Sequence, residues 1–228
     1  MNNESRVLSR RNFLKVTGGS MLAIASGATL GCSLDRINNS TAENIVKNEH
    51  AKKILVLTGS PHRNGTTALL AEQFIQGAKS KGHLVNRFDS AFENVKPCNR
   101  CEYCKENSGK CIFEDAMERL SPELVAADVL VLVTPIYYFG MTRQLKCVIE
   151  RFYSQNVALQ GKKSTMLLAA SGSKVDWVMD GLLGHYKCLC RYMKWEDQGS
   201  ILAAGCPTRE HLLNTSFPEL ANTLGASV

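Results

Sequence analysis

The sequence predicts an α/β protein with a doubly wound, five-stranded parallel sheet in the order 2-1-3-4-5, arranged as a three-layer αβα fold. From Lys53 onward, short apolar runs that suit buried parallel strands alternate with amphipathic helical patterns. A loop of small and hydroxyl residues follows the first run, and a helix follows the loop. Because ligands bind at the carboxyl ends of the strands in such sheets, we expect the functional site there.

The apolar patterns also place the individual elements. Strands are expected at 54–57, 83–89, 128–134, 164–170 and 200–204, and the alternation in 83–89 is typical of an edge strand. Helices are expected after residue 66, at 114–127, 141–154 and 175–194, and from 209 onward. A Cys-rich insertion at 91–113 separates the second strand from the third, so we expect it to enter the fold beside the first loop.

Length and charge limit the classes of protein to which the chain can belong. With 228 residues, 44% of them hydrophobic, it can bury one sizeable core. Half of the formal net charge of +6 lies in residues 1–31, and the remainder is too small to predict a nucleic-acid partner. The histidines outside the first loop lie apart and are expected to face solvent, and no Ser/His/Asp or HExxH pattern supports a hydrolase.

The N-terminus carries an export signal. Ser9–Lys15 matches the twin-arginine pattern S-R-R-x-F-L-K, and the apolar stretch Val16–Gly31 is too short to span a bilayer comfortably. Residues 1–31 are therefore predicted to be a twin-arginine signal peptide, which exports folded proteins, often with a cofactor already inserted. The expected location is the periplasm or the cell envelope.

The end of this signal leaves two outcomes open. Thr29-Leu30-Gly31-Cys32 resembles a lipoprotein cleavage box, except that Thr29 stands where Leu or Val is usual. The protein is then either anchored to the membrane through a lipidated Cys32 or released without a lipid. Residues 32–52 are polar and without periodicity, which predicts a linker to a domain at 53–228.

The loop after the first strand has the composition of an anion site. Ser60, Asn64, Gly65, Thr66 and Thr67 lie where free N–H groups and the positive end of a helix dipole attract a phosphate. No Lys follows Gly65, so the loop is not a Walker A motif, and it is not a GxGxxG fingerprint either. Hydroxyls and backbone that bind phosphate without Mg²⁺ are typical of flavodoxin-type binding of flavin mononucleotide (FMN). The alternative is an ordinary turn in which Thr66 caps the helix.

Four of the nine cysteines form a compact motif, Cys98-x2-Cys101-x2-Cys104-x6-Cys111. This spacing suits one [4Fe–4S] cluster with all four thiolates as ligands, because the sequence has no second set. Structural zinc, disulfides in an oxidising compartment and a motif without metal are the alternatives. The remaining cysteines of the domain are scattered and are predicted to be buried thiols.

Two ordered motifs carry a family resemblance. The first is Gly59-Ser60-Pro61-His62-Arg63-Asn64-Gly65-Thr66-Thr67, and the second is Thr134-Pro135-Ile136-Tyr137-Tyr138-Phe139-Gly140-Met141-Thr142-Arg143-Gln144-Leu145-Lys146. Together with the four cysteines, they resemble the NADPH-dependent FMN reductase group of flavodoxin-like proteins, and especially its iron-sulfur flavoprotein branch. His62 stands where that family usually has Arg, so Arg63 is the candidate for a charge contact to the phosphate.

The resemblance implies an FMN site made by three loops. Its residues would be Ser60, His62, Arg63, Asn64, Gly65, Thr66 and Thr67, then Pro135, Ile136, Tyr137, Tyr138, Phe139 and Gly140, and finally Ser171 and Gly172. Gly140 permits a close backbone approach, and Tyr137 or Tyr138 can pack on the flavin ring. Trp177, just beyond the third loop, is expected to serve helix packing rather than to touch the flavin.

The predicted function is an exported FMN-dependent oxidoreductase in which the flavin is the reactive group, so no side chain is assigned a catalytic role. The resemblance implies NAD(P)H as the donor and a homodimer or homotetramer. Export favours a quinol or a redox protein instead, because soluble nicotinamides are scarce outside the cytoplasm; the expected partner is a redox protein or a quinone. Two alternatives remain: a membrane-tethered, flavodoxin-like electron carrier, and a cluster-free NAD(P)H:FMN or quinone reductase.

Overall fold

The computed structural model describes residues 51–161 and 163–228. Within them lies a five-stranded, all-parallel sheet in the order β2-β1-β3-β4-β5, which confirms the predicted topology. The strands are β1 (Lys53–Thr58), β2 (Leu84–Asp89), β3 (Val129–Pro135), β4 (Ser164–Ala170) and β5 (Glu196–Ala203). The α-helices are α1 (Thr66–Ser80), α2 (Tyr103–Glu106), α3 (Met117–Ala126), α4 (Arg143–Glu150), α5 (Asn156–Leu159), α6 (Asp180–Met193), α7 (Arg209–Leu213) and α8 (Phe217–Ala226), with 3₁₀ segments η1 (Ser90–Phe92) and η2 (Arg151–Gln155).

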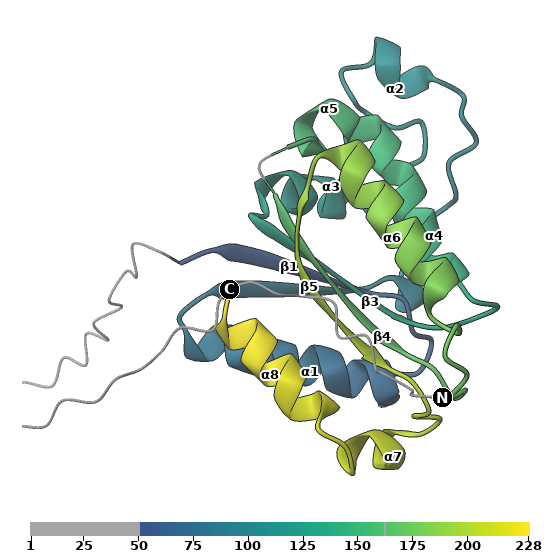
Figure 1. Ribbon diagram of the computed structural model, residues 1–228. Helices are drawn as coiled ribbons and strands as arrows, with labels where there is room; N and C mark the ends of the chain where they lie inside the picture. The colour runs from purple at the N-terminus through teal and green to yellow at the C-terminus, as the bar shows by residue number, and fades with distance from the viewer. Residues whose placement is uncertain (1–50, 162) are drawn as a thin grey trace, which may run out of the picture. The chain divides into compact units, whose positions relative to one another are not determined.

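The sheet is the middle of three layers. Alternate residues of β1 point to opposite faces, because side chains along a strand have a period of two. Ile54 and Val56 join the core cluster under α1 and α8, whereas Leu55 and Leu57 join the one under α3, α4 and α6. Figure 1 shows α1, α7 and α8 below the sheet and α3, α4 and α6 above it. Burial on both faces explains why β1, β3 and β4 are continuous apolar runs.

Several element boundaries differ from those expected. The helix expected at 175–194 begins only at Asp180, because residues 176–179 form a turn. The helix expected at 141–154 is α4 followed by η2. Strand β5 begins at Glu196 rather than near 200, because its backbone pairs with β4 although its first residues are polar and exposed. The C-terminal helical region consists of two helices, α7 and α8.

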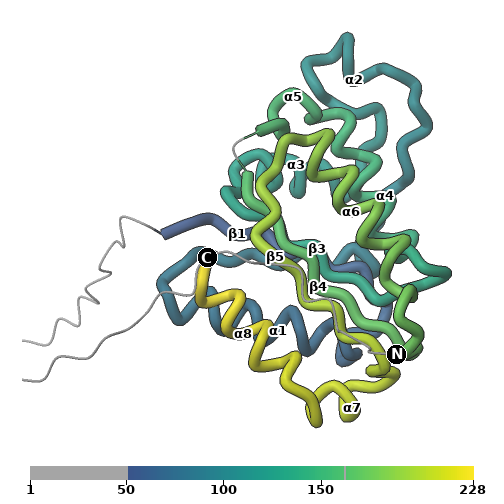
Figure 2. The backbone as a smooth tube through the Cα atoms, in the orientation of Figure 1, coloured from purple at the N-terminus to yellow at the C-terminus, as the bar shows by residue number. Residues whose placement is uncertain are grey.

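The Cys-rich insertion leaves the sheet after η1 and returns at α3. Between these two points the insertion contains the four-residue helix α2, which Figure 2 shows at the end of the insertion farthest from the sheet. The predicted signal peptide, Cys32 and almost all of the predicted linker lie outside the described residues. Among the described helices, none combines the length and apolar character that a membrane-spanning helix needs.

Candidate functional site

The loop between β1 and α1 leaves the first turn of α1 open. Gly65 is the N-cap residue, and no side chain accepts a hydrogen bond from the first turn of the helix. The alternative in which Thr66 caps the helix is therefore wrong, because Thr66 is already the first helical residue. The Ser60 hydroxyl folds the loop by accepting a hydrogen bond from the His62 N–H at 3.1 Å, and the Gly65 N–H donates to the His62 carbonyl at 3.1 Å.

The charge around this open helix end favours an anion. The first turn of α1 holds no acidic residue, so nothing there competes for the N–H groups or cancels the helix dipole. The Arg63 guanidinium lies 3.7 Å from the centroid of the Phe92 ring, where the ring holds it by a cation–π contact. Ser60 and Thr67 are buried, whereas His62, Arg63 and Asn64 are exposed. The loop thus combines buried hydroxyls with free backbone donors.

Thr142 ties the second predicted loop to the first. Its hydroxyl donates to the Gly59 carbonyl at 2.8 Å, and its N–H donates to the Thr134 hydroxyl at 3.1 Å. The backbones approach so closely that a Cβ on Gly59 would collide with Thr142 Oγ1 and lie 2.8 Å from the Cβ of Leu145. Only glycine fits at this contact, which fixes the ends of β1 and β3 relative to one another.

The second loop makes a tight turn that presents aromatic rings. Tyr137 and Gly140 exchange two backbone hydrogen bonds, at 3.0 and 3.1 Å, and the two residues between them adopt positive φ, 45° at Tyr138 and 63° at Phe139. Bulky residues rarely adopt this conformation, which costs of order 1–3 kcal/mol unless the surroundings impose it. The start of α6 packs tightly against this turn, since a Cβ on Gly181 would lie 2.6 Å from the Phe139 carbonyl oxygen.

Trp177 belongs to this aromatic surface. Its ring centroid lies 4.9 Å from that of Phe139, and more than half of its side chain is exposed. Tyr138 is fully exposed, and Tyr137 and Phe139 are close to half exposed. The expectation that Trp177 serves helix packing is therefore wrong: it precedes α6, and its ring contacts Phe139 of the predicted cofactor loop. No sequence pattern linked Trp177 to Phe139, because the two residues meet only in the fold.

The third loop follows β4 and is held to the end of β5. The Ser171 N–H donates to the Ala203 carbonyl at 2.9 Å, the Cys206 N–H donates back to the Ser171 carbonyl at 2.8 Å, and the Ser171 hydroxyl accepts from the Ser173 N–H at 3.1 Å. The three loops leave the carboxyl ends of neighbouring strands, β1, β3 and β4. The fold therefore brings all three predicted FMN-binding segments to one edge. The uncapped helix and the exposed aromatic turn fit a flavin phosphate and its ring.

The four clustered cysteines meet in one small pocket. Cys98, Cys101, Cys104 and Cys111 all line it, together with side chains of the Cys-rich insertion and of η2. Burial raises the pKa of the Cys104 thiol, and the charges of the three other thiols raise that pKa further, as expected for closely spaced sulfurs.

The backbone of this segment is arranged around the sulfurs. Arg100 and Glu102 adopt positive φ, and the Arg100 N–H donates to the Cys98 sulfur at 3.4 Å. All eight cysteines of the described residues are free thiols. As they lie, no group of three or more His, Cys, Asp or Glu side chains in this part of the chain could hold a metal ion. The four thiols nonetheless line one pocket, with an N–H donor to one of the sulfurs.

A buried ion pair closes the Cys-rich segment. The Arg151 side chain is 2% exposed and that of Asp115 is 0% exposed, and two hydrogen bonds of 2.7 and 3.2 Å join them. Arg151 also donates to the Lys96 carbonyl at 3.0 Å, and Asp115 accepts from the N–H groups of Lys96 and Met117, each at 3.0 Å. Burial alone would raise the pKa of Asp115, but the Arg151 and backbone hydrogen bonds lower it below its ordinary value. The pair thus joins both ends of the segment to η2.

The Cys-rich segment enters the fold beside the FMN loops, as expected, and its cysteines lie beyond the other end of α4. The segment starts beside them, since the Ser90 hydroxyl donates to the Thr58 carbonyl. Residues 90–97 then line a cavity along α4, and the cysteines reach Arg151 and Ser154 beyond its C-terminal end. Thr142 and Arg151 cap the two ends of the eight-residue helix α4, and their nine-position separation corresponds to about 13 Å along the helix axis. The cysteines therefore lie at one end of α4 and the predicted phosphate loop at the other.

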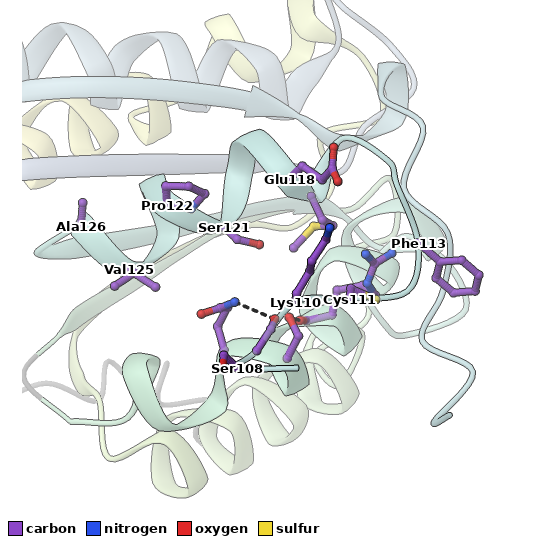
Figure 3. Close-up of a pocket in the computed structure, with 14 residues that line it drawn as sticks. Ser108, Lys110, Cys111, Phe113, Glu118, Ser121, Pro122, Val125 and Ala126 are labelled. Atoms are coloured by element: carbon purple, nitrogen blue, oxygen red, sulfur yellow. Dashed lines mark hydrogen bonds between the residues drawn. The ribbon is translucent and has the colours of Figure 1, made fainter. Parts of the chain in front are cut away.

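A wider groove adjoins the cysteine pocket. Its volume is about 630 Å³, and it lies between the second half of the Cys-rich segment, α3 and η2. Figure 3 shows Cys111 and Phe113 at one end of it and Val125 and Ala126 at the other. Arg151 lines both this groove and the cysteine pocket, so its side chain belongs to the wall between them.

The remaining thiols and histidines only partly match expectation. Cys190 and Cys206 are buried as predicted, and burial raises the pKa of Cys190 to about 11. Cys188 is exposed and Cys147 half-buried, so those two predictions are wrong. His185 is half-buried rather than solvent-facing, and burial, followed by the charge of Lys146, lowers its pKa. His83 is likewise half-buried. None of these residues adds to the site.

The fold and the loops at its carboxyl edge define a flavodoxin-like protein. Residues 52–189 match the family model described as NADPH-dependent FMN reductase. The chain therefore belongs to this family, as the resemblance of the two motifs predicted.

Curated relatives include iron-sulfur flavoproteins. One from Methanocaldococcus jannaschii is 29% identical over 108 residues, which are 47% of this chain and 55% of the relative. Another, from Methanosarcina thermophila, is 26% identical over 125 residues, 54% of this chain and 64% of the relative. The chain thus spans little more than half the length of these relatives.

Solved structures share the fold at low sequence identity. An NAD(P)H:quinone oxidoreductase from Methanothermobacter marburgensis superposes with a TM-score of 0.58 at 16% identity, covering 78% of this chain and 96% of that one. An FMN-dependent NADH-azoreductase from Bacillus anthracis, solved in complex with FMN, gives 0.57 at 14% identity, covering 77% and 98%. These likenesses concern the fold alone.

Proposed function

We propose that this protein is an exported, FMN-dependent oxidoreductase that also carries a [4Fe–4S] cluster. The observation that carries the proposal is the meeting of three loops at the carboxyl edge of the sheet, in a chain of the FMN reductase family. Bound FMN would exchange a pair of electrons with a donor and pass them on. The chain itself would bind the phosphate at the open end of α1 and present the Tyr137–Gly140 turn to the ring.

The cluster rests on three features of the Cys-rich segment. Four thiols line one pocket, an N–H group donates to one of the sulfurs, and the relatives named iron-sulfur flavoproteins are similar to this chain. Cys98, Cys101, Cys104 and Cys111 would hold the cluster, which would supply single-electron transfer to or from a partner. Iron and acid-labile sulfide, measured on anaerobically purified protein, test this. About four of each per chain support the cluster, whereas one zinc per chain or two disulfides contradict it.

Two observations favour different electron donors. Family membership favours NAD(P)H, whereas the twin-arginine motif favours a quinol or a redox protein, because soluble nicotinamides are scarce outside the cytoplasm. Catalytic turnover of quinone or nitroaromatic acceptors with NADPH, NADH or a quinol as the reductant separates these donors. Reduction of the flavin without turnover by any of them supports the second candidate, an electron carrier tethered through Cys32 after the export motif.

FMN binding itself has a direct test. The purified protein, or the protein reconstituted with FMN, should carry one FMN per chain that resists gel filtration. A folded protein that stays colourless after reconstitution contradicts the proposal.

Export has its own test. Replacing Arg10 and Arg11 by Lys should hold the precursor in the cytoplasm, and continued export in a strain without the twin-arginine translocase contradicts this assignment.

A further inference from the structure

Arg151 stands out because its buried side chain is only partly satisfied. Its two terminal nitrogens face the Asp115 carboxylate end-on, and one of them also donates to the Lys96 carbonyl. This geometry leaves the Nε–H edge of the guanidinium free. Nε is buried and has no hydrogen-bond partner, and Thr165 Oγ1 is the other such side-chain atom in the described part of the chain. A buried donor without a partner costs free energy, and a ligand that accepts a hydrogen bond from Nε would remove this cost.

The cysteine pocket is where such a ligand would lie. Arg151 lines this pocket beside all four cysteines, whereas Asp115 does not. The positive member of the ion pair therefore shares a pocket with the sulfurs, and its negative member does not. Thiolates and sulfide ions are anionic acceptors, so a sulfur-bound cluster would be stabilised by both the charge and the free N–H.

We propose that Arg151 is a positioning residue for the four-cysteine site. Its two terminal nitrogens close the Cys-rich segment by holding Lys96 and Asp115, and its Nε–H edge serves as a donor to the sulfurs of the cluster. The inference rests on the proposed function, because it needs the cysteines to hold a cluster. It goes further in assigning Arg151, which lies forty residues beyond Cys111 in the sequence, a part in setting the reduction potential.

The test compares two Arg151 variants with a matched control in the full protein. Arg151→Lys keeps a buried charge beside Asp115 but has no Nε–H, and Arg151→Met removes the charge. Arg119→Met is the control, because Arg119 pairs with Glu93 at the surface near the same segment. FMN content reports whether each variant folds. The readouts are iron and sulfide per chain, the reduction potential from a titration followed by paramagnetic resonance, and the alkylation rate of the thiols in the iron-free protein.

Arg151→Lys should fold and load iron to at least 80% of the wild-type content, but its reduction potential should be lower, because hydrogen bonds to sulfur raise that potential. Arg151→Met should lose at least half of the iron while it keeps FMN, and its four thiols should be alkylated at least fivefold faster. Arg119→Met should match the wild type in every readout.

Three outcomes overturn the inference. Wild-type iron content and potential in both Arg151 variants would overturn it while the cluster stands. A loss of iron in Arg151→Met with an unchanged potential in Arg151→Lys would reduce Arg151 to a loop anchor and would also overturn it. A wild-type protein that takes up no iron would overturn the cluster proposal itself, and the inference with it.

Discussion

The two ends of helix α4 are built in different ways. At its N-terminal end, the predicted phosphate loop is fixed by the ends of β1 and β3, by the Thr142 hydroxyl and by a contact at Gly59 that only glycine fits. At its C-terminal end, the Cys-rich segment has one four-residue helix and is closed by the buried Arg151–Asp115 pair. The first site is held in place by the strands of the hydrophobic core. The second depends on a few polar contacts, so it should open locally without unfolding the sheet.

The largest effect should come from breaking the buried pair. Asp115→Ala leaves the Arg151 charge buried without its partner, which costs about 3–5 kcal/mol. We expect this loss to appear as local opening of residues 91–116, measured by hydrogen exchange or limited proteolysis, with FMN still bound. Glu93→Ala is the matched control, because it removes a surface partner worth no more than about 1 kcal/mol. Equal protection in the two variants would show that the pair does not close the segment.

The second-largest effect should come from a substitution beside the predicted phosphate loop. In Gly59→Ala, the new Cβ collides with Thr142 Oγ1 and crowds Leu145, an overpacking that costs about 1–3 kcal/mol. We expect a lower melting temperature and weaker FMN binding, measured by thermal unfolding and flavin titration. Gly184→Ala is the control: this glycine lies inside α6 with nothing within 4 Å of its would-be Cβ, so alanine should stabilise the helix by up to about 1 kcal/mol. A neutral Gly59→Ala would contradict the tight contact.

A third prediction separates binding from stability in the same loop. Thr66→Glu places a carboxylate in the first turn of α1, where the helix dipole favours it by about 0.3–1 kcal/mol. The FMN-free protein should therefore keep or slightly raise its melting temperature. FMN affinity should fall at least about tenfold, because the carboxylate repels the phosphate. Unchanged affinity would place the phosphate elsewhere. Thr66→Gln, which adds similar bulk without charge, is the control.

The smallest expected effect is a change of stability with pH. Burial, and then the charge of Lys146, lowers the pKa of His185 in α6 below its ordinary 6.5. Its contribution to stability is present above pH 6.5 and is lost as the pH falls through the lowered pKa, because the unfolded state binds the proton more readily. The pKa of Asp115 is lowered from 3.8, so its contribution is lost only below that pH.

On acidification from neutral pH, the sheet domain should therefore weaken slightly before the Cys-rich segment loosens. Urea unfolding from pH 7.5 to 5 should show this slope in the wild type and a smaller slope in His185→Gln, in which His83, whose pKa is also lowered by burial and by the charge of Lys52, still contributes. The same slope in both proteins would assign it to another group.

The sequence by itself determined the fold, and it predicted the two candidate sites. The apolar runs of β1, β3 and β4 are visible because both faces of these strands are buried, and the spacing of Cys98 to Cys111 is local. Both signals depend on neighbours in the chain, so they can be found without the tertiary structure. The match of residues 52–189 to the family model likewise needs only the sequence.

Only the tertiary structure decided which residues serve these sites from a distance. Arg151 resembles any arginine of an amphipathic helix until the fold sets it against Asp115 and the cysteines. Trp177 meets Phe139 from the turn before α6, a contact that its helical pattern does not predict. The fold likewise carried the cysteines to the far end of α4. These pairs are joined by packing between residues that are distant in sequence, and no local periodicity records such contacts.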